Sequence, residues 1–195
     1  MKVQERLISY VTVRTPSNEE SETVPSSMCQ FDLARKLEKE MQELGLTEVV
    51  LDDKCYLYGK LPATKGKENI PAIGFIAHMD TVSDFCDHEI HPIITENYDG
   101  GELTLGTSGL ILNPKEFPHL AELKGRTLIT SDGITILGAD DKAGIAEILT
   151  MIERIQTEKL PHGTICVAFT PDEEIGMGAE HFNLEQFGAE YAYTL

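Results

Sequence analysis

Apolar residues recur every three or four positions in two long stretches of the chain. This spacing places them on one face of a helix, and Gly45 follows the first stretch as a common helix end. The apolar positions are Phe31, Ala34, Leu37, Met41 and Leu44, and then Ile145, Ile148, Leu149, Ile152 and Ile155. Both patterns predict amphipathic helices packed on a core. Residues 3–11 predict a further short helix, and Ser26 or Ser27 is placed to cap the helix that contains Phe31.

Short apolar runs between these helices predict strands. Residues 47–53 and 55–62 predict the first two strands of a sheet, and residues 73–77 and 165–170 predict buried strands. Residues 189–195 predict a final strand. Because strands alternate with helices, we expect an α/β fold in three layers around a mixed, mostly parallel sheet.

The pattern is weaker between residues 84 and 125. A turn at Asp99-Gly100-Gly101 predicts a hairpin within residues 91–106, and residues 127–138 predict two short strands joined by a turn. Residues 178–188 predict a short helix before the final strand.

Charge and composition narrow the class of protein. The net charge is −17, from 16 basic and 33 acidic side chains, which argues against binding to nucleic acid or to an anionic membrane. No apolar run approaches the roughly 20 residues that span a bilayer, and the first residues lack the apolar core of a signal peptide. Four scattered cysteines without a CxxC pair favour reduced thiols in a cytoplasmic protein.

Acidic residues, and in one place a histidine, gather at three boundaries between predicted elements. In α/β sheets the ends of strands are where ligands collect. The residues are His78 and Asp80, then Asp140 and Asp141, and then Asp172, Glu173 and Glu174.

Each cluster taken singly has a structural explanation. Asp140 or Asp141 could cap the helix that follows, and His78 could be a hydrogen-bonded histidine at the edge of the core. The acidic run from Asp172 to Glu174 could be a solvated turn.

Taken together, the three clusters favour a metal site. Carboxylates that converge on one edge of a sheet repel each other unless they share protons or bind cations. One imidazole with several carboxylates suits Zn²⁺, Mn²⁺ or Co²⁺, and two such ions bridged by a carboxylate form a hydrolytic centre. Glu173 and Glu174 are adjacent, so one could bind metal while the other moves protons.

The segments AHMDTV, GADDKAG and TPDEEIG, in this order and separation, resemble the M20 family of di-zinc metallopeptidases. The resemblance extends from the first helix to the final segment FGAEYAYTL. It implies a zinc-exopeptidase-like catalytic domain and a metal-dependent aminopeptidase, in which a water activated by two zinc ions releases the N-terminal residue of tripeptides. The segment GADDKAG favours this branch of the family over its deacylases and carboxypeptidases.

The resemblance also implies a role for each residue. His78 would bind one metal, and Asp80 would fix the orientation of the His78 ring. Asp140 would bridge both metals, and the peptide bond after it would be cis. Glu173 would be the general base that takes a proton from the water and passes it to the leaving amine. Glu174 would bind the second metal.

The family pattern is not complete within this chain. A further aspartate and a histidine that bind metal, and a small inserted domain that mediates dimerisation, are expected beyond Leu195. Residues 1–195 are therefore expected to be the N-terminal part of a catalytic domain, and the whole protein a homodimer that acts on short peptides. Each metal would keep only two ligands here, so we expect weak zinc binding and no useful peptidase activity from this chain alone. Sheet surface left uncovered should favour self-association.

Two other functions remain open at this point. One is an M20-type deacylase or dipeptidase acting on N-acyl amino acids. The other is a non-catalytic homologue that keeps the fold, which loss of Asp140 or Glu173 would have supported, but both residues are present.

Overall fold

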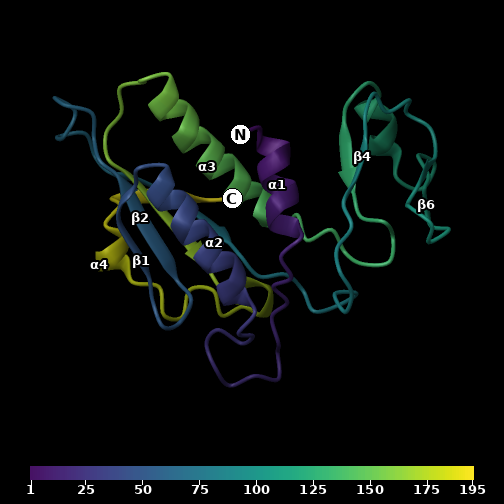
Figure 1. Ribbon diagram of the computed structural model, residues 1–195, viewed down its shortest axis with the longest axis horizontal. Coiled ribbons are helices and arrows are strands. Elements are labelled where there is room, and N and C mark those ends of the chain that lie inside the picture. The colour runs from purple at the N-terminus through teal and green to yellow at the C-terminus, as the bar shows by residue number, and fades with distance from the viewer. The chain divides into compact units, whose positions relative to one another are not determined.

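The computed structural model describes residues 1–195 (Figure 1). The chain divides into two units that are described separately. The first contains residues 1–83 and 138–195, and the second contains residues 84–137. All of the residues expected to carry the chemistry lie in the first unit.

Five strands form the sheet of the first unit, in the order β1-β2-β8-β3-β9. In chain order they are β1 (Thr47–Leu51), β2 (Leu57–Leu61), β3 (Ile73–His78), β8 (Ile165–Thr170) and β9 (Tyr191–Thr194). Strand β2 pairs antiparallel with β1 and β8, whereas β3 pairs parallel with β8 and β9. Four of the five strands therefore run in one direction, which confirms the mixed, mostly parallel sheet.

Three helices cover one face of this sheet. They are α1 (Val3–Val11), α2 (Gln30–Glu43) and α3 (Lys142–Thr157), and the bounds of α1 are those predicted. Their apolar faces meet the strands in a core where Leu37 of α2, Leu149 of α3 and Val167 of β8 are fully buried. Figure 1 shows α2 running over β1 and β2. The predicted apolar stripes are thus the faces that pack on the sheet.

The opposite face of the sheet carries a smaller cluster. Tyr58 and Ala168 project from the strands and pack with Phe187 of the one-turn helix α4 (Leu184–Phe187). Phe182 joins this cluster edge-on to the Phe187 ring, with centroids 5.2 Å apart. The third layer therefore consists of α4 and the residues just before it. No helix in the structure combines the length and the apolar composition needed to cross a membrane.

Gly74 of β3 lies where this second cluster leaves no space for a side chain. A Cβ at this position would lie 2.3 Å from Cζ of Phe187 and 2.9 Å from Cβ of Ala192. Phe187 is 4% exposed, so its ring has little room to move away. We expect Gly74→Ala to lower the free energy of unfolding by about 1–3 kcal/mol, the usual cost of overpacking. Urea unfolding followed by circular dichroism measures it, and an unchanged midpoint would contradict the packing described.

The second unit consists of two small sheets and a 3₁₀ helix. Strand β4 (Ile93–Thr95) pairs with β7 (Leu128–Thr130), β5 (Leu103–Thr104) pairs with β6 (Ile111–Leu112), and the 3₁₀ helix covers Pro118–Leu123. All pairings are antiparallel.

This arrangement corrects two predictions. The turn at Asp99–Gly101 exists, with Gly100 at φ +87° and the Gly101 N–H donating to Asp99, but it does not join a hairpin. Instead the backbone of Tyr98 forms hydrogen bonds with Gly125 and Arg126. The strand before Tyr98 is β4, and it pairs with β7. Residues 134–137 form no strand. The prediction of a turn at Asp99–Gly101 is confirmed, but the predicted pairing of the strands on either side of it is wrong.

Candidate active site

His78 is the last residue of β3, and both ring nitrogens face oxygen atoms. Its Nδ1 lies 3.1 Å from the backbone oxygen and 3.4 Å from Oδ1 of Asp80. Its Nε2 lies 3.2 Å from Oδ1 of Asp140 and 3.7 Å from Oε2 of Glu173. Three of the sequence-predicted residues therefore converge on one imidazole.

Asp80 joins the end of β3 to the loop that follows β8. Its side chain is fully buried, and its two oxygens accept the backbone N–H groups of Glu173 (3.0 Å) and Glu174 (3.1 Å). The parallel register sets this contact, because His78 of β3 is paired with Thr170 of β8. Asp80 thus orients the backbone of both glutamates in addition to facing the His78 ring.

Asp140 and Asp141 have different environments. Asp141 is the N-cap of α3, and its Oδ1 accepts the Gly144 N–H at 3.0 Å. Its Oδ2 is buried without a hydrogen-bond partner. The Asp140 side chain is 88% exposed and reaches only toward His78. Of the two aspartates that could cap α3, Asp141 does so, whereas Asp140 remains available to a ligand. The expected cis peptide bond between the two is present.

The charges around the imidazole favour a cation. Burial lowers the pKa of His78, but the hydrogen bond to Asp80 and the charges of Asp80, Glu173 and Asp141 outweigh it and raise that pKa to about 9. Burial raises the pKa of Glu174, His78 opposes the rise, and the nearby carboxylates of Asp140, Asp80 and Glu173 add to it. A positive charge at this place would relieve the repulsion among the carboxylates.

The donor types fit a zinc ion, although their number is small. Imidazole and carboxylate are zinc ligands, and the electrostatic environment favours a cation. The chain contains no group of three or more His, Cys, Asp or Glu side chains arranged to hold a metal ion. Glu174 lies close enough to His78 and Asp140 for their charges to act on its pKa, without a direct hydrogen bond between their side chains.

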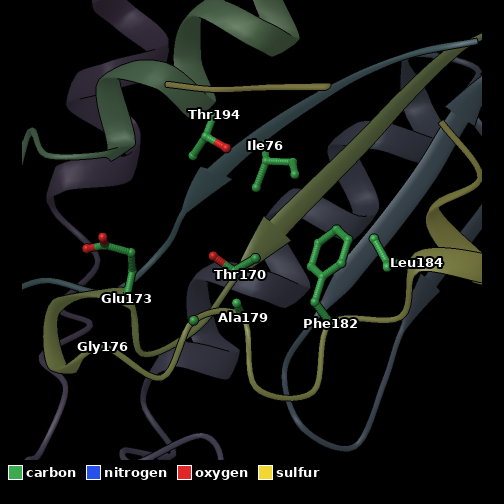
Figure 2. A pocket seen from close by; sticks show the side chains of 9 residues that line it. Ile76, Thr170, Glu173, Gly176, Ala179, Phe182, Leu184 and Thr194 are labelled. Atoms are coloured by element: carbon green, nitrogen blue, oxygen red, sulfur yellow. The ribbon is translucent and has the colours of Figure 1, made fainter. Parts of the chain in front are cut away.

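An apolar pocket of about 520 Å³ borders Glu173. Its lining residues come from β3, β8 and β9, from the segment between β8 and α4, and from the first residue of α4: Ile76, Thr170, Glu173, Gly176, Gly178, Ala179, Phe182, Leu184 and Thr194. Figure 2 shows the Glu173 carboxylate at one side of the pocket and the Phe182 ring and Leu184 at the other. Glu173 therefore lies between the His78 cluster and an apolar concavity.

Three residues that the sequence did not single out for this role also hold the site loops. Asp172 accepts hydrogen bonds from Ser26 and Gln30. Ser26 was expected as a possible helix cap, but the N-cap of α2 is Cys29, which makes no side-chain cap hydrogen bond. The prediction was wrong because the Ser26 hydroxyl bonds to the distant Asp172. A polar loop without periodicity carries no signal for such a contact.

Comparison with known proteins extends these observations to the whole chain. The model of peptidase family M20/M25/M40 matches residues 131–194. A peptidase T from Desulfitobacterium hafniense (strain Y51) is 53% identical over 195 residues, which is 99% of this chain and 47% of that protein. The chain thus spans about half the length of the curated relatives it matches.

Solved structures of two peptidases are similar in fold to this chain. The crystal structure of aminopeptidase PepT from Bacillus cereus ATCC 10987 has a TM-score of 0.69 and 30% sequence identity, covering 99% of this chain and 42% of that chain. A tripeptidase from Staphylococcus aureus has a TM-score of 0.67 and 26% identity, covering 98% and 42%. By sequence along its whole length and by the fold of its sheet, this chain is similar to peptidase T, and its residues 131–194 match the model of peptidase family M20/M25/M40.

Proposed function

We propose that this chain supplies part of the active site of a metal-dependent aminopeptidase that removes the N-terminal residue from tripeptides. The observation that carries the proposal is the convergence of Asp140 and Glu173 on the Nε2 atom of His78, at 3.2 and 3.7 Å. Similarity to peptidase T and to a tripeptidase supports the substrate class. We expect the whole protein to be a cytoplasmic homodimer, and four scattered cysteines without a CxxC pair support the cytoplasm.

His78, Asp140 and Glu174 would hold two zinc ions in the complete site. When bound, zinc supplies a Lewis acid that polarises the scissile carbonyl and lowers the pKa of water. Asp140 is the residue suited to bridge two ions, because its side chain is 88% exposed and is not engaged in capping α3. Asp141 carries out the capping instead.

Glu173 would move the proton. Its carboxylate is 56% exposed and lies within 3.7 Å of the His78 ring, so it can face a water molecule beside the metal ligands. It would accept a proton from that water and donate it to the amine of the leaving peptide. Asp80 would hold the geometry, because it faces the His78 ring and accepts the N–H groups of Glu173 and Glu174.

Zinc titration tests this proposal. We expect this chain to bind zinc weakly, because a catalytic zinc normally has three protein ligands and no such group is present here. A longer form, extended at the C-terminus to the length of the relatives, should bind two zinc ions tightly and cleave tri-alanine. Calorimetry measures the binding, and a peptidase assay measures the cleavage. Failure of the extended chain to bind zinc would contradict the site, and full activity of residues 1–195 alone would contradict the expected shortage of ligands.

The alternative of a deacylase or dipeptidase makes a different prediction. Such an enzyme would hydrolyse an N-acyl amino acid or a dipeptide faster than tri-alanine. The relatives that match the whole chain at about half identity are peptidase T, which favours the tripeptide. Parallel assays on tri-alanine, a dipeptide and an N-acetyl amino acid with the extended chain decide between the two.

A further inference from the structure

Asp172 is a buried acid that the proposed mechanism does not use. Its side chain is 1% exposed, and its backbone adopts φ +55° in the left-handed region. This region is uncommon for residues other than glycine, and Asn, Asp and His enter it most readily. Burial of a carboxylate is costly unless hydrogen bonds compensate it, so the contacts of Asp172 show what holds it there.

Three hydrogen bonds hold the Asp172 carboxylate. Ser26 donates its backbone N–H to Oδ2 at 2.7 Å and its hydroxyl to Oδ1 at 2.5 Å, and Gln30 donates its side-chain amide to Oδ1 at 2.6 Å. Gln30 is fully buried, and its Oε1 has no partner. The carboxylate therefore orients the Gln30 amide, and Gln30 in turn attaches the loop after β8 to the first turn of α2.

The segment before α2 also holds the other loop of the site. The backbone of Ser17 donates to Thr81 at 3.0 Å, and the Thr15 hydroxyl donates to the Met79 carbonyl at 2.7 Å. The residues on either side of Asp80 are thus bound to the same stretch of chain that carries Ser26. One polar segment therefore touches both strand ends at which the proposed ligands lie.

The backbone of Glu173 and Glu174 is consequently held on two sides. Their N–H groups donate to Asp80, and the residue before them is held by Ser26 and Gln30. The Glu173 side chain is 56% exposed, so packing by neighbours does little to fix it. The direction in which it leaves the backbone depends on these attachments.

We propose that Asp172 is a positioning residue, which through Ser26 and Gln30 holds Glu173 and Glu174 in the orientation that catalysis needs. The inference rests on the proposed function, in which Glu173 moves the proton and Glu174 binds metal. Asp172 is buried behind the loop, so it acts on the reaction only through the backbone of its neighbours.

Amide hydrogen exchange of this chain, followed by NMR, tests the positioning without metal or substrate. Asp172→Asn keeps the size and the tolerance for positive φ but removes one acceptor. Gln30→Met removes one donor and replaces it with an apolar side chain of similar length. We expect both variants to raise the exchange rates of the Glu173 and Glu174 amides by about tenfold, the factor that one hydrogen bond of ordinary net strength gives. If Asp172→Asn fails to fold, Gln30→Met still provides the test.

Thr150→Val is the matched control. Thr150 lies on α3 and accepts a hydrogen bond from Arg6 at 2.7 Å, so its replacement also removes one part-buried polar contact. It should leave exchange at Glu173 and Glu174 unchanged once global stability is taken into account. Equal effects of the three variants on these two amides would overturn the proposal, because Asp172 would then contribute to stability alone.

An activity measurement on an extended, peptide-cleaving form separates the positioning from the proposed function. We expect Asp172→Asn to lower kcat by about 10- to 100-fold, as loss of residues that orient metal ligands does, with KM changed by less than about threefold. Unchanged kcat in this variant would overturn the positioning role. If the unsubstituted form cleaves no peptide while the exchange result holds, the proposed function fails and the positioning of the loop stands.

Discussion

Replacing Glu173 by glutamine in a peptide-cleaving form of the enzyme is expected to lower kcat by about 10²–10⁴-fold, the range for loss of a general acid–base group. Glutamine keeps the length and the hydrogen-bonding shape of the side chain but cannot accept the proton. Because Glu173 is proposed to move protons and Glu174 to bind metal, zinc affinity should change little. Steady-state kinetics on tri-alanine and zinc titration of the same variant measure the two effects separately.

Two further variants make this result specific. Glu185→Gln makes the same chemical change on the exposed first turn of α4 and should leave kcat and zinc affinity unchanged. Glu174→Gln should weaken zinc binding. If Glu173→Gln lost zinc while Glu174→Gln kept it, the roles of the two glutamates would be exchanged. A loss of kcat below about tenfold would remove Glu173 from the proton transfer.

Arg6→Met is expected to lower the free energy of unfolding by about 3 kcal/mol. Arg6 is 2% exposed, and its guanidinium donates to Glu40 at 2.7 Å, to Thr150 at 2.7 Å and to Glu153 at 3.0 Å. Removing one partner of a buried ion pair costs about 3–5 kcal/mol, because the other charge remains unpaired. Glu40 and Glu153 are 17% and 29% exposed, so water compensates part of this cost and the lower end of the range applies.

Urea unfolding measures this change, with Arg154→Met as the control. Arg154 forms an exposed pair with Glu158 one helical turn away, with side chains 71% and 46% exposed. Pairs of this kind contribute about 0.3–0.5 kcal/mol, so the control should stay near the parent protein. Equal losses in the two variants would show that Arg6 stabilises the chain only as a surface charge.

The fold could be predicted where a local pattern determines the buried face. The isoleucine stripe of α3 and the apolar run of β3 have one arrangement that hides them from water, and both elements lie where they were predicted. Strands of three residues, such as β4 and β7, have no such pattern. Their pairing depends on contacts distant in sequence, for example between Tyr98 and Arg126, which a turn signal does not reveal.

The same distinction applies to the candidate site. His78, Asp140 and Glu173 could be singled out because a metal site explains why a histidine and several acids lie at the boundaries of predicted elements. The structure brings these three side chains together. The capping role of Asp141 was one of two open choices, which the contact with Gly144 decides. The contact between Ser26 and Asp172 joins residues 146 positions apart, and neither residue lies on a periodic element. It required the folded structure.

The packing of α1 on α3 also has a consequence for synthesis on the ribosome. Arg6 meets Glu153, 147 residues later, so α1 finds its partner on α3 only after a long stretch of further synthesis. At typical rates of elongation this interval lasts roughly 7–30 seconds. During that time the face of α1 that packs on α3 has no partner, although Glu40 of α2 can already meet Arg6 and Tyr10. The nascent chain should therefore present a binding site for ribosome-associated chaperones until α3 has emerged.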